Sequence, residues 1–185
     1  EQPKILIREA GNRITASYYD SGFYIMSSLY ACILIDKNFN LKYILSLLNS
    51  SLFQFQLKLI AFDKTKGAFT KARIFHYYEL PVKIIDSKKQ NLFIEKVDSM
   101  ISVCDKFSRS TTTFLMYLKS QFLIKNLSIK LRKWYELEFN DLVKELNKKI
   151  DKQKASLLDD SSKFSLMKLF DEQKQEVLLL NSEIN

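Results

Sequence analysis

The sequence predicts an α+β fold: a small mixed α/β domain followed by an all-helical region with a long coiled-coil-like helix. All three glycines and both prolines lie before residue 82, so nothing in residues 82–185 forces a break in a helix. Before that point, short runs rich in β-branched and aromatic residues alternate with turn signals. After it, apolar residues recur every three or four positions, which is the period of a helix. We therefore predict two domains, residues 1–86 and residues 87–185.

The α/β domain contains four short runs that are predicted as strands. They are Lys4–Arg8, Ile14–Tyr19, Phe23–Met26 and Leu29–Ile35. Gly11 and Gly22 lie in turn signals between them. The Leu29–Ile35 run is apolar on both faces, which predicts a central strand. Glu79–Val82 is typical of an exit into one more short strand.

A helical stripe follows the strands. Apolar residues from Leu41 to Phe62 recur at steps of four and three, so this helix is expected to be buried against the sheet. Asn49, Ser50 and Ser51 interrupt the stripe with residues of poor helix propensity. The helix is expected to bend or restart there.

The second region has a longer apolar repeat. It comprises Phe93, Val97, Met100, Cys104, Phe107, Thr111, Phe114 and Leu118. This heptad-like spacing predicts one helix from about Gln90 to Ile124, with a possible kink at Ser108–Thr113. Two further helices are predicted around Leu142 and Phe170, and we interpret all of these stripes as helix-packing seams.

The charge of the chain favours a polyanionic partner. The formal net charge is +8, and residues 1–90 hold 13 Lys and Arg against 7 Asp and Glu. No apolar run reaches the length of a membrane span, and no signal peptide is recognisable. Cys32 and Cys104 occur singly, which suits a reducing compartment and a cytoplasmic location. Because the chain begins Glu1-Gln2-Pro3, we interpret it as a fragment of a longer protein.

Catalytic chemistry is not expected in this chain. His76 is the only histidine, and we interpret it as structural, so no catalytic residue, metal site or cofactor is predicted. Asp159 or Asp160 with Glu172 and Lys174 superficially matches a nuclease pattern. Within a helix, however, Glu172 and Lys174 point to different faces, so a solvated helix surface is the preferred interpretation.

A basic and aromatic surface is the strongest functional signal, and it predicts binding to double-stranded DNA. Lys and Arg release counterions from phosphates, and Arg pairs with guanine in the major groove. The predicted DNA face consists of the loops around Gly11–Arg13, Tyr18–Gly22 and Asp63–Arg73, with Arg13 and Arg73 reading base edges. The candidate DNA-binding residues are Arg8, Arg13, Tyr18, Lys64, Lys66, Lys71 and Arg73.

The order of several segments resembles the TaqI-like C-terminal specificity domain of type IIG restriction-modification enzymes, which is related to type I specificity subunits. The segments in the first domain are Pro3–Arg8, Tyr19-Asp20, Ser28–Tyr30, Tyr43–Ser50 and Glu79–Val82. Those in the helical tail are Lys130–Phe139 and Phe170–Lys174. The Asn49-Ser50 interruption fits this pattern.

The resemblance implies that the first domain is a target-recognition domain. It also implies a parent enzyme with an upstream methyltransferase domain that methylates adenine with S-adenosylmethionine, and a magnesium-dependent nuclease in many members. Neither activity is expected in this chain, since the motifs for them are missing. An alternative is a coiled-coil protein-interaction module with no DNA role, and a second is a self-contained nuclease that uses Glu172 and Lys174.

Overall fold

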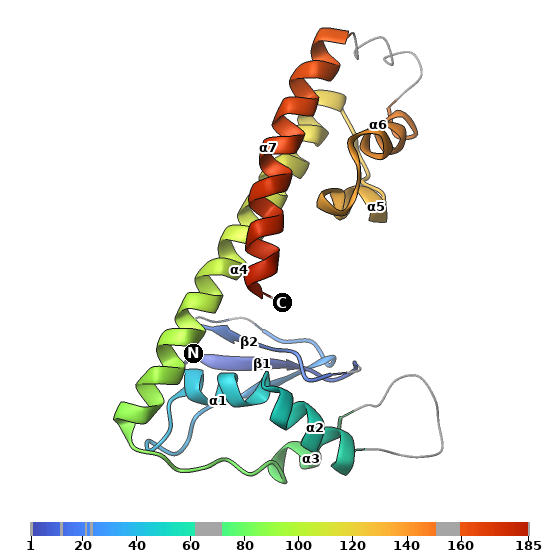
Figure 1. The fold of residues 1–185 in the computed structure, drawn as a ribbon. Helices are drawn as coiled ribbons and strands as arrows, with labels where there is room; N and C mark the ends of the chain where they lie inside the picture. The colour runs from blue at the N-terminus through green and yellow to red at the C-terminus, as the bar shows by residue number, and fades with distance from the viewer. Residues whose placement is uncertain are drawn as a thin grey trace. The chain divides into compact units, whose positions relative to one another are not determined.

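In a computed structural model of the chain (Figure 1), residues 2–11, 13–20, 22, 24–61, 72–150 and 160–184 are described. The chain forms two compact units, residues 1–99 and 100–185, which we call the amino-terminal and carboxy-terminal units. The first contains a small antiparallel sheet with helices, and the second is helical in its described part. The predicted α+β fold with a long helix is therefore confirmed.

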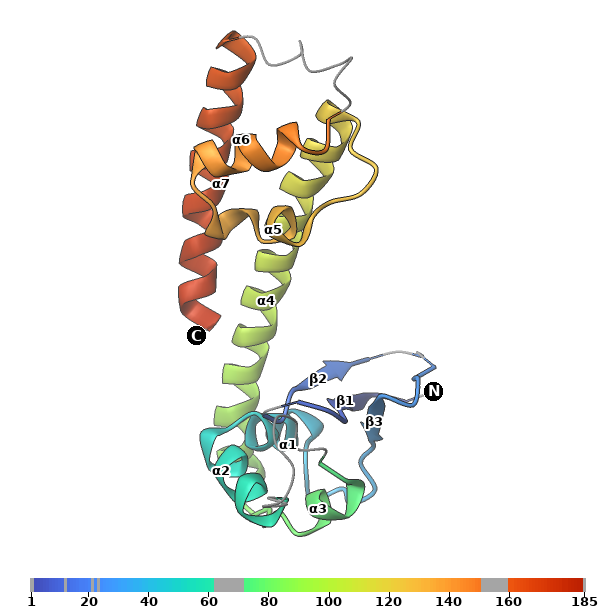
Figure 2. The ribbon, with the colours of Figure 1, turned by 90° about the vertical axis from the view of Figure 1, so that its right-hand side faces the viewer.

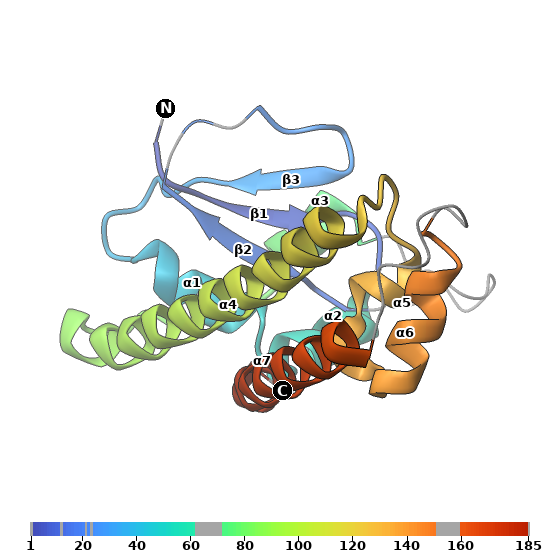
Figure 3. The same ribbon diagram turned by 90° about the horizontal axis from the view of Figure 1, so that it is seen from above.

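The sheet has three strands in the order β2-β1-β3 (Figure 3). They are β1 (Lys4–Arg8), β2 (Ala16–Tyr19) and β3 (Leu29–Cys32), and both neighbours run antiparallel to β1. The central strand is thus Lys4–Arg8, and the prediction that Leu29–Ile35 is central was wrong. β3 ends at Cys32 and lies at an edge, with the side chains of Ile33 and Ile35 exposed beyond it.

Two further strand predictions were also wrong. Residues 24–26, the described part of Phe23–Met26, form no strand. Because β2 and β3 run in the same direction, the segment between them must cross from one end of the sheet to the other, and it leaves Tyr24 fully exposed. Glu79–Val82 is likewise no strand. Glu79 is the C-cap of α3 (Ile74–Tyr78), a helix that we did not predict, and Leu80 after it is buried in the core.

The predicted helix from Leu41 to Phe62 restarts at the polar interruption, one of the two expected outcomes. α1 (Leu41–Leu48) is followed by α2 (Ser51–Ile60). Ser50 begins α2 as its N-cap, with the hydroxyl accepting a hydrogen bond from Phe53 N at 3.2 Å. The core of the unit forms where Ile5 and Ile7 of β1 meet the apolar faces of α1 and α2, which lie below the sheet in Figure 1.

The long helix α4 (Ser87–Phe122) continues without a break through Ser108–Thr113, where a kink was considered possible. Its first turns belong to the amino-terminal unit. Gln90 is only 4% exposed; its side chain accepts from Asn40 N at 2.9 Å and donates to the carbonyls of Asn38 and Ile85 at 2.7 and 3.0 Å. Leu123 follows the last residue of α4 and has a positive φ of 51°. This conformation ends the helix and lets Ile124 N donate back to Lys119 O.

In its described part, the carboxy-terminal unit is built around the end of α4 and four more elements (Figure 2). These are α5 (Ile129–Arg132), the short 3₁₀ helix η1 (Trp134–Glu136), α6 (Phe139–Asn147) and α7 (Asp160–Ile184). Trp134 is fully buried, with its ring 4.1 Å from that of Phe114 and 5.9 Å from that of Phe170. This aromatic cluster forms the centre of the second core.

Candidate DNA interface

The turn between β1 and β2 brings two of the predicted DNA-binding residues together. Arg8 is the last residue of β1, and Arg13 lies in the turn; both are exposed. A Cβ on Gly11 would lie 3.3 Å from the Arg13 carbonyl oxygen and 3.8 Å from Cδ of Arg8, so a larger residue would crowd the turn. Neither arginine forms an ion pair with a described carboxylate. Their charges therefore face solvent, as a phosphate contact requires.

Main-chain hydrogen bonds fix the end of β1 to both neighbouring strands. Arg8 N donates to Thr15 O at 3.0 Å, on the β2 side, and Glu9 N donates to Ser28 O at 3.0 Å, on the β3 side. The turn therefore leaves the sheet from a defined position.

Two side-chain carboxamides hold the other arm of the turn. Asn49 Oδ1 accepts from Ala16 N at 3.1 Å, and Asn49 Nδ2 donates to Ala16 O at 3.0 Å. Gln54 does the same for Ile14: Oε1 accepts from Ile14 N at 2.6 Å, and Nε2 donates to Ile14 O at 3.0 Å. Asn49 was expected only to interrupt the helix, and no role was predicted for Gln54. Both are polar residues beside an apolar helical stripe, and this position is the sequence feature that could have identified them.

The sheet register places Tyr18 on the opposite face from Arg8. Residues paired across an antiparallel sheet share a face, so Tyr18 lies with Ile5 on the helix-covered side, whereas Arg8 follows Ile7 and points to the other side. The Nζ of Lys42 lies 5.2 Å from the Tyr18 ring centroid and 2.6 Å from Asp98 Oδ1. The structure thus joins Tyr18 to α1 and α4 rather than to the arginines of the turn.

The Tyr18 hydroxyl is held protonated by its surroundings. A hydrogen bond to Asp20, partial burial and the negative charges of Asp20 and Asp98 raise the pKa of Tyr18 to about 12. At neutral pH this side chain is a neutral hydrogen-bonding group.

Arg73 lies on the helical side of the sheet, at the start of α3. Its main-chain N donates to His76 Nδ1 at 3.0 Å, and His76 N donates to the Arg73 carbonyl at 3.0 Å. These two hydrogen bonds between Arg73 and His76 cap the first turn of α3, so the His76 side chain has a structural role. The Arg73 side chain is exposed and forms no ion pair with a described carboxylate.

The remaining candidates, Lys64, Lys66 and Lys71, lie outside the described residues. The described residues on either side of that segment, Ala61 and Ala72, are both buried in the core of the amino-terminal unit.

No other arrangement within the described ranges suggests catalysis. They contain no group of three or more His, Cys, Asp or Glu that could hold a metal ion. Lys174 binds Leu137 O at 2.8 Å and Glu138 Oε1 at 2.9 Å, while Glu172 is exposed. Lys174 thus serves as a structural cation on α7.

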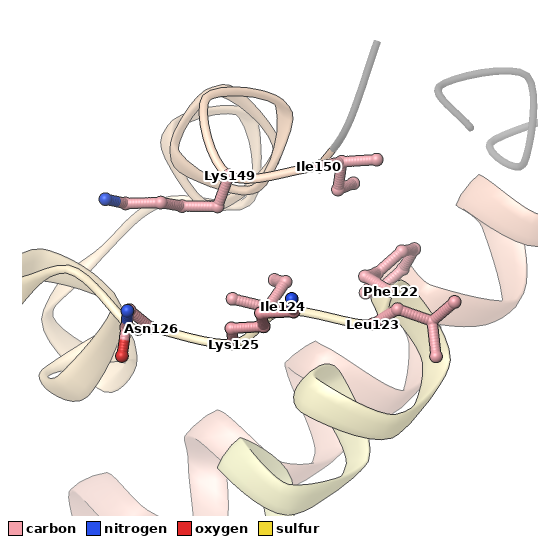
Figure 4. A pocket seen from close by; sticks show the side chains of 7 residues that line it. All are labelled: Phe122, Leu123, Ile124, Lys125, Asn126, Lys149 and Ile150. Atoms are coloured by element: carbon pink, nitrogen blue, oxygen red, sulfur yellow. The ribbon is translucent and has the colours of Figure 1, made fainter. Parts of the chain in front are cut away.

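Two cavities also lack catalytic groups. One, of about 370 Å³, lies between β3, α1 and α3. Burial raises the pKa of the Cys32 thiol in its wall, and burial together with the neighbouring Tyr30 raises the pKa of Tyr77 to about 12. Cys32 and Tyr77 therefore stay protonated at neutral pH. The other, of about 780 Å³, lies at the end of α4 (Figure 4). Its polar lining groups are those of Lys125, Asn126 and Lys149, together with main chain.

Family models match both parts of the chain. Residues 1–82 match the TaqI-like C-terminal specificity domain. Residues 86–185, which are more than half of the chain, match Domain of unknown function (DUF8810). The chain belongs to that family. No curated protein and no solved structure matches the chain.

The match of residues 1–82 to the specificity-domain model confirms the resemblance described above and indicates DNA target recognition in restriction-modification for this part of the chain. A specificity domain is itself non-catalytic. A search of the described residues finds no helix that is long and apolar enough to cross a membrane.

Proposed function

We propose that this chain is the DNA-reading part of a bacterial restriction-modification enzyme, with the specificity domain gripping double-stranded DNA through its β1–β2 turn. The observation that carries the proposal is the pair Arg8 and Arg13, exposed together on a turn of a TaqI-like specificity domain. Arginines of this kind bind phosphates and guanine edges. Arg73, which lies on the helical side of the sheet, and the lysines Lys64, Lys66 and Lys71 would make a second contact with DNA from the segment that precedes α3.

The parent enzyme, on this proposal, carries an adenine methyltransferase domain upstream of the chain, uses S-adenosylmethionine and works in the cytoplasm, as type IIG enzymes do. A nuclease domain would add a requirement for magnesium. The specificity domain would hold DNA against that catalytic half, and the DUF8810 region would serve as spacer and docking surface.

The test is the affinity of the chain for a fluorescent random-sequence duplex, measured by anisotropy at several salt concentrations. Replacing Arg8 and Arg13 together by Ala is expected to weaken binding about tenfold at low salt and to lower the salt slope by up to about 2. The matched control replaces Arg109 and Arg132, exposed arginines of the carboxy-terminal unit. Equal effects of the two double variants would remove the β1–β2 turn from the interface.

A second candidate function is a coiled-coil interaction module, because part of the apolar seam of α4 is exposed. Phe93 is 39% exposed and Met100 is 41% exposed. Light scattering separates the two functions: a stable dimer that ignores DNA supports the interaction module, whereas a monomer with salt-sensitive DNA affinity supports target recognition.

A further inference from the structure

The outer edge of β2 is paired with side chains instead of a strand. Along a strand, successive residues direct their main-chain groups to opposite edges. Thr15 accepts from Arg8 N of β1, so Ile14 and Ala16 direct their N–H and C=O groups outward. All four of these groups are bonded by Asn49 and Gln54, at distances of 2.6 to 3.1 Å.

The carboxamides of Asn and Gln are suited to this pairing. Each presents an acceptor and a donor side by side, as one residue of an antiparallel strand does with its C=O and N–H, so each can take the place of one residue of a neighbouring strand. Asn49 ends α1 and Gln54 lies in the first turn of α2, and Gln54 Nε2 also reaches Leu48 O at 3.3 Å. The break between α1 and α2 thus places the side-chain carboxamides of Asn49 and Gln54 beside the outer edge of β2.

We propose that Asn49 and Gln54 are positioning residues for DNA sequence discrimination, acting through Ile14 and Ala16 on the adjacent Arg13. The inference rests on the proposed function, because it assigns the β1–β2 turn a role in reading DNA. Phosphate contacts tolerate a mobile turn, since charge attracts from many positions. Base-edge contacts require a fixed main chain, since bidentate hydrogen bonds depend on geometry. Releasing the turn should therefore reduce discrimination while leaving non-specific affinity intact.

The first experiment tests the mechanical part of the proposal in the full chain, without DNA. Gln54→Met keeps the length of the side chain but removes its hydrogen bonds. Gln56→Met is the matched control on the same helix, because Gln56 Oε1 is buried with no hydrogen-bond partner among the described residues. Hydrogen exchange of the Ile14 amide should quicken about tenfold or more in Gln54→Met. An equal rate in wild type, Gln54→Met and Gln56→Met would overturn the proposal.

The second experiment tests discrimination. Sequences are selected from random duplexes with the wild-type chain, and affinities for a selected and an unrelated duplex are compared. Gln54→Met is expected to lower their ratio about tenfold, with unchanged affinity for the unrelated duplex, whereas Gln56→Met changes neither. If wild type selects no sequence, the proposed function fails and this inference with it. If wild type selects a sequence and Gln54→Met retains the full ratio, only the inference is overturned.

A second variant covers the case in which Gln54→Met does not fold. Gln54→Glu keeps the size of the side chain and accepts from Ile14 N but cannot donate to Ile14 O. It is expected to lose part of the discrimination, and Asn49→Asp should behave in the same way towards Ala16. Full discrimination in both acidic variants would overturn the proposal.

Discussion

At the scale of single residues, three polar side chains of the amino-terminal unit connect segments that are far apart in the sequence. Gln90, Asn49 and Gln54 each bond main-chain groups that lie at least 33 positions away in the sequence. Propensity alone treats such residues as poor helix formers. Their positions are explained only when their partners on other elements are known.

Tyr18 gives a residue-scale prediction for pH dependence. Its pKa is raised from 10.0 to about 12, and the hydrogen bond to Asp20 is the largest cause. The folded state therefore favours the protonated phenol. The associated stability is present below pH 10, the unfolded value, and is lost as the pH rises from 10 to about 12.

The measurement is an ultraviolet titration of tyrosinate absorbance, taken as the difference between wild type and Tyr18→Phe. In Asp20→Ala the pKa of Tyr18 should fall towards its ordinary value, because both the hydrogen bond and a nearby charge are removed. A Tyr18 pKa that is the same with and without Asp20 would contradict this account.

At the scale of secondary-structure elements, the carboxy-terminal unit is held together by one aromatic cluster. Phe170 of α7 is 1% exposed, and its ring lies 5.7 Å from that of Phe139 on α6 and 6.2 Å from that of Phe114 on α4. Since three helices meet at this one side chain, its removal affects the packing of all of them.

We expect Phe170→Ala to lower the free energy of unfolding of the carboxy-terminal unit by roughly 3–5 kcal/mol, the usual cost of removing a buried aromatic ring. The chain has one tryptophan, Trp134, and it lies in this core, so urea unfolding followed by its fluorescence reports on this unit. Phe164→Ala is the control, because Phe164 is on the same helix but 73% exposed. Equal shifts in the two variants would show that the cluster does not hold the unit together.

Several elements were predictable because their signals are local. The period of apolar residues predicted α4 and the α1–α2 region, and the absence of glycine and proline predicted a helical second part. The strand β3 was predicted, but its edge position and the five-residue helix α3 were not, because both depend on contacts with residues far away in the sequence. The restart at Ser50 was one of two expected outcomes, and the capping hydrogen bond decided it.

At the scale of the whole molecule, the net charge of +8 is the property that most directly concerns DNA. Charge of this sign attracts a duplex whatever its sequence. The attraction weakens as the salt concentration rises, because the release of condensed counterions then gains less entropy. Non-specific affinity should thus be a property of the chain as a whole, whereas discrimination should depend on the β1–β2 turn and its supports.

Replacing Lys64, Lys66 and Lys71 together by Ala is expected to weaken binding to all sequences and to reduce the salt slope by about 3 at most. The control replaces Lys106, Lys119 and Lys168, exposed residues of the carboxy-terminal unit, and so removes the same charge elsewhere. Affinity measured against salt concentration compares the two triple variants. An unaltered slope in the first variant would remove the 63–73 loop from the interface.

The sequence by itself determined the fold class, the long helix, the positive charge and the resemblance of the first part to a specificity domain, because composition, periodicity and the order of short segments are properties of the chain read in one dimension. Only the tertiary structure decided that β1 is central, that Tyr18 and Arg8 lie on opposite faces, and that Asn49 and Gln54 pair with β2. The physical reason is that strand register and main-chain hydrogen bonding join residues far apart in the sequence. A shift of one residue in register reverses the face on which every side chain of a strand lies.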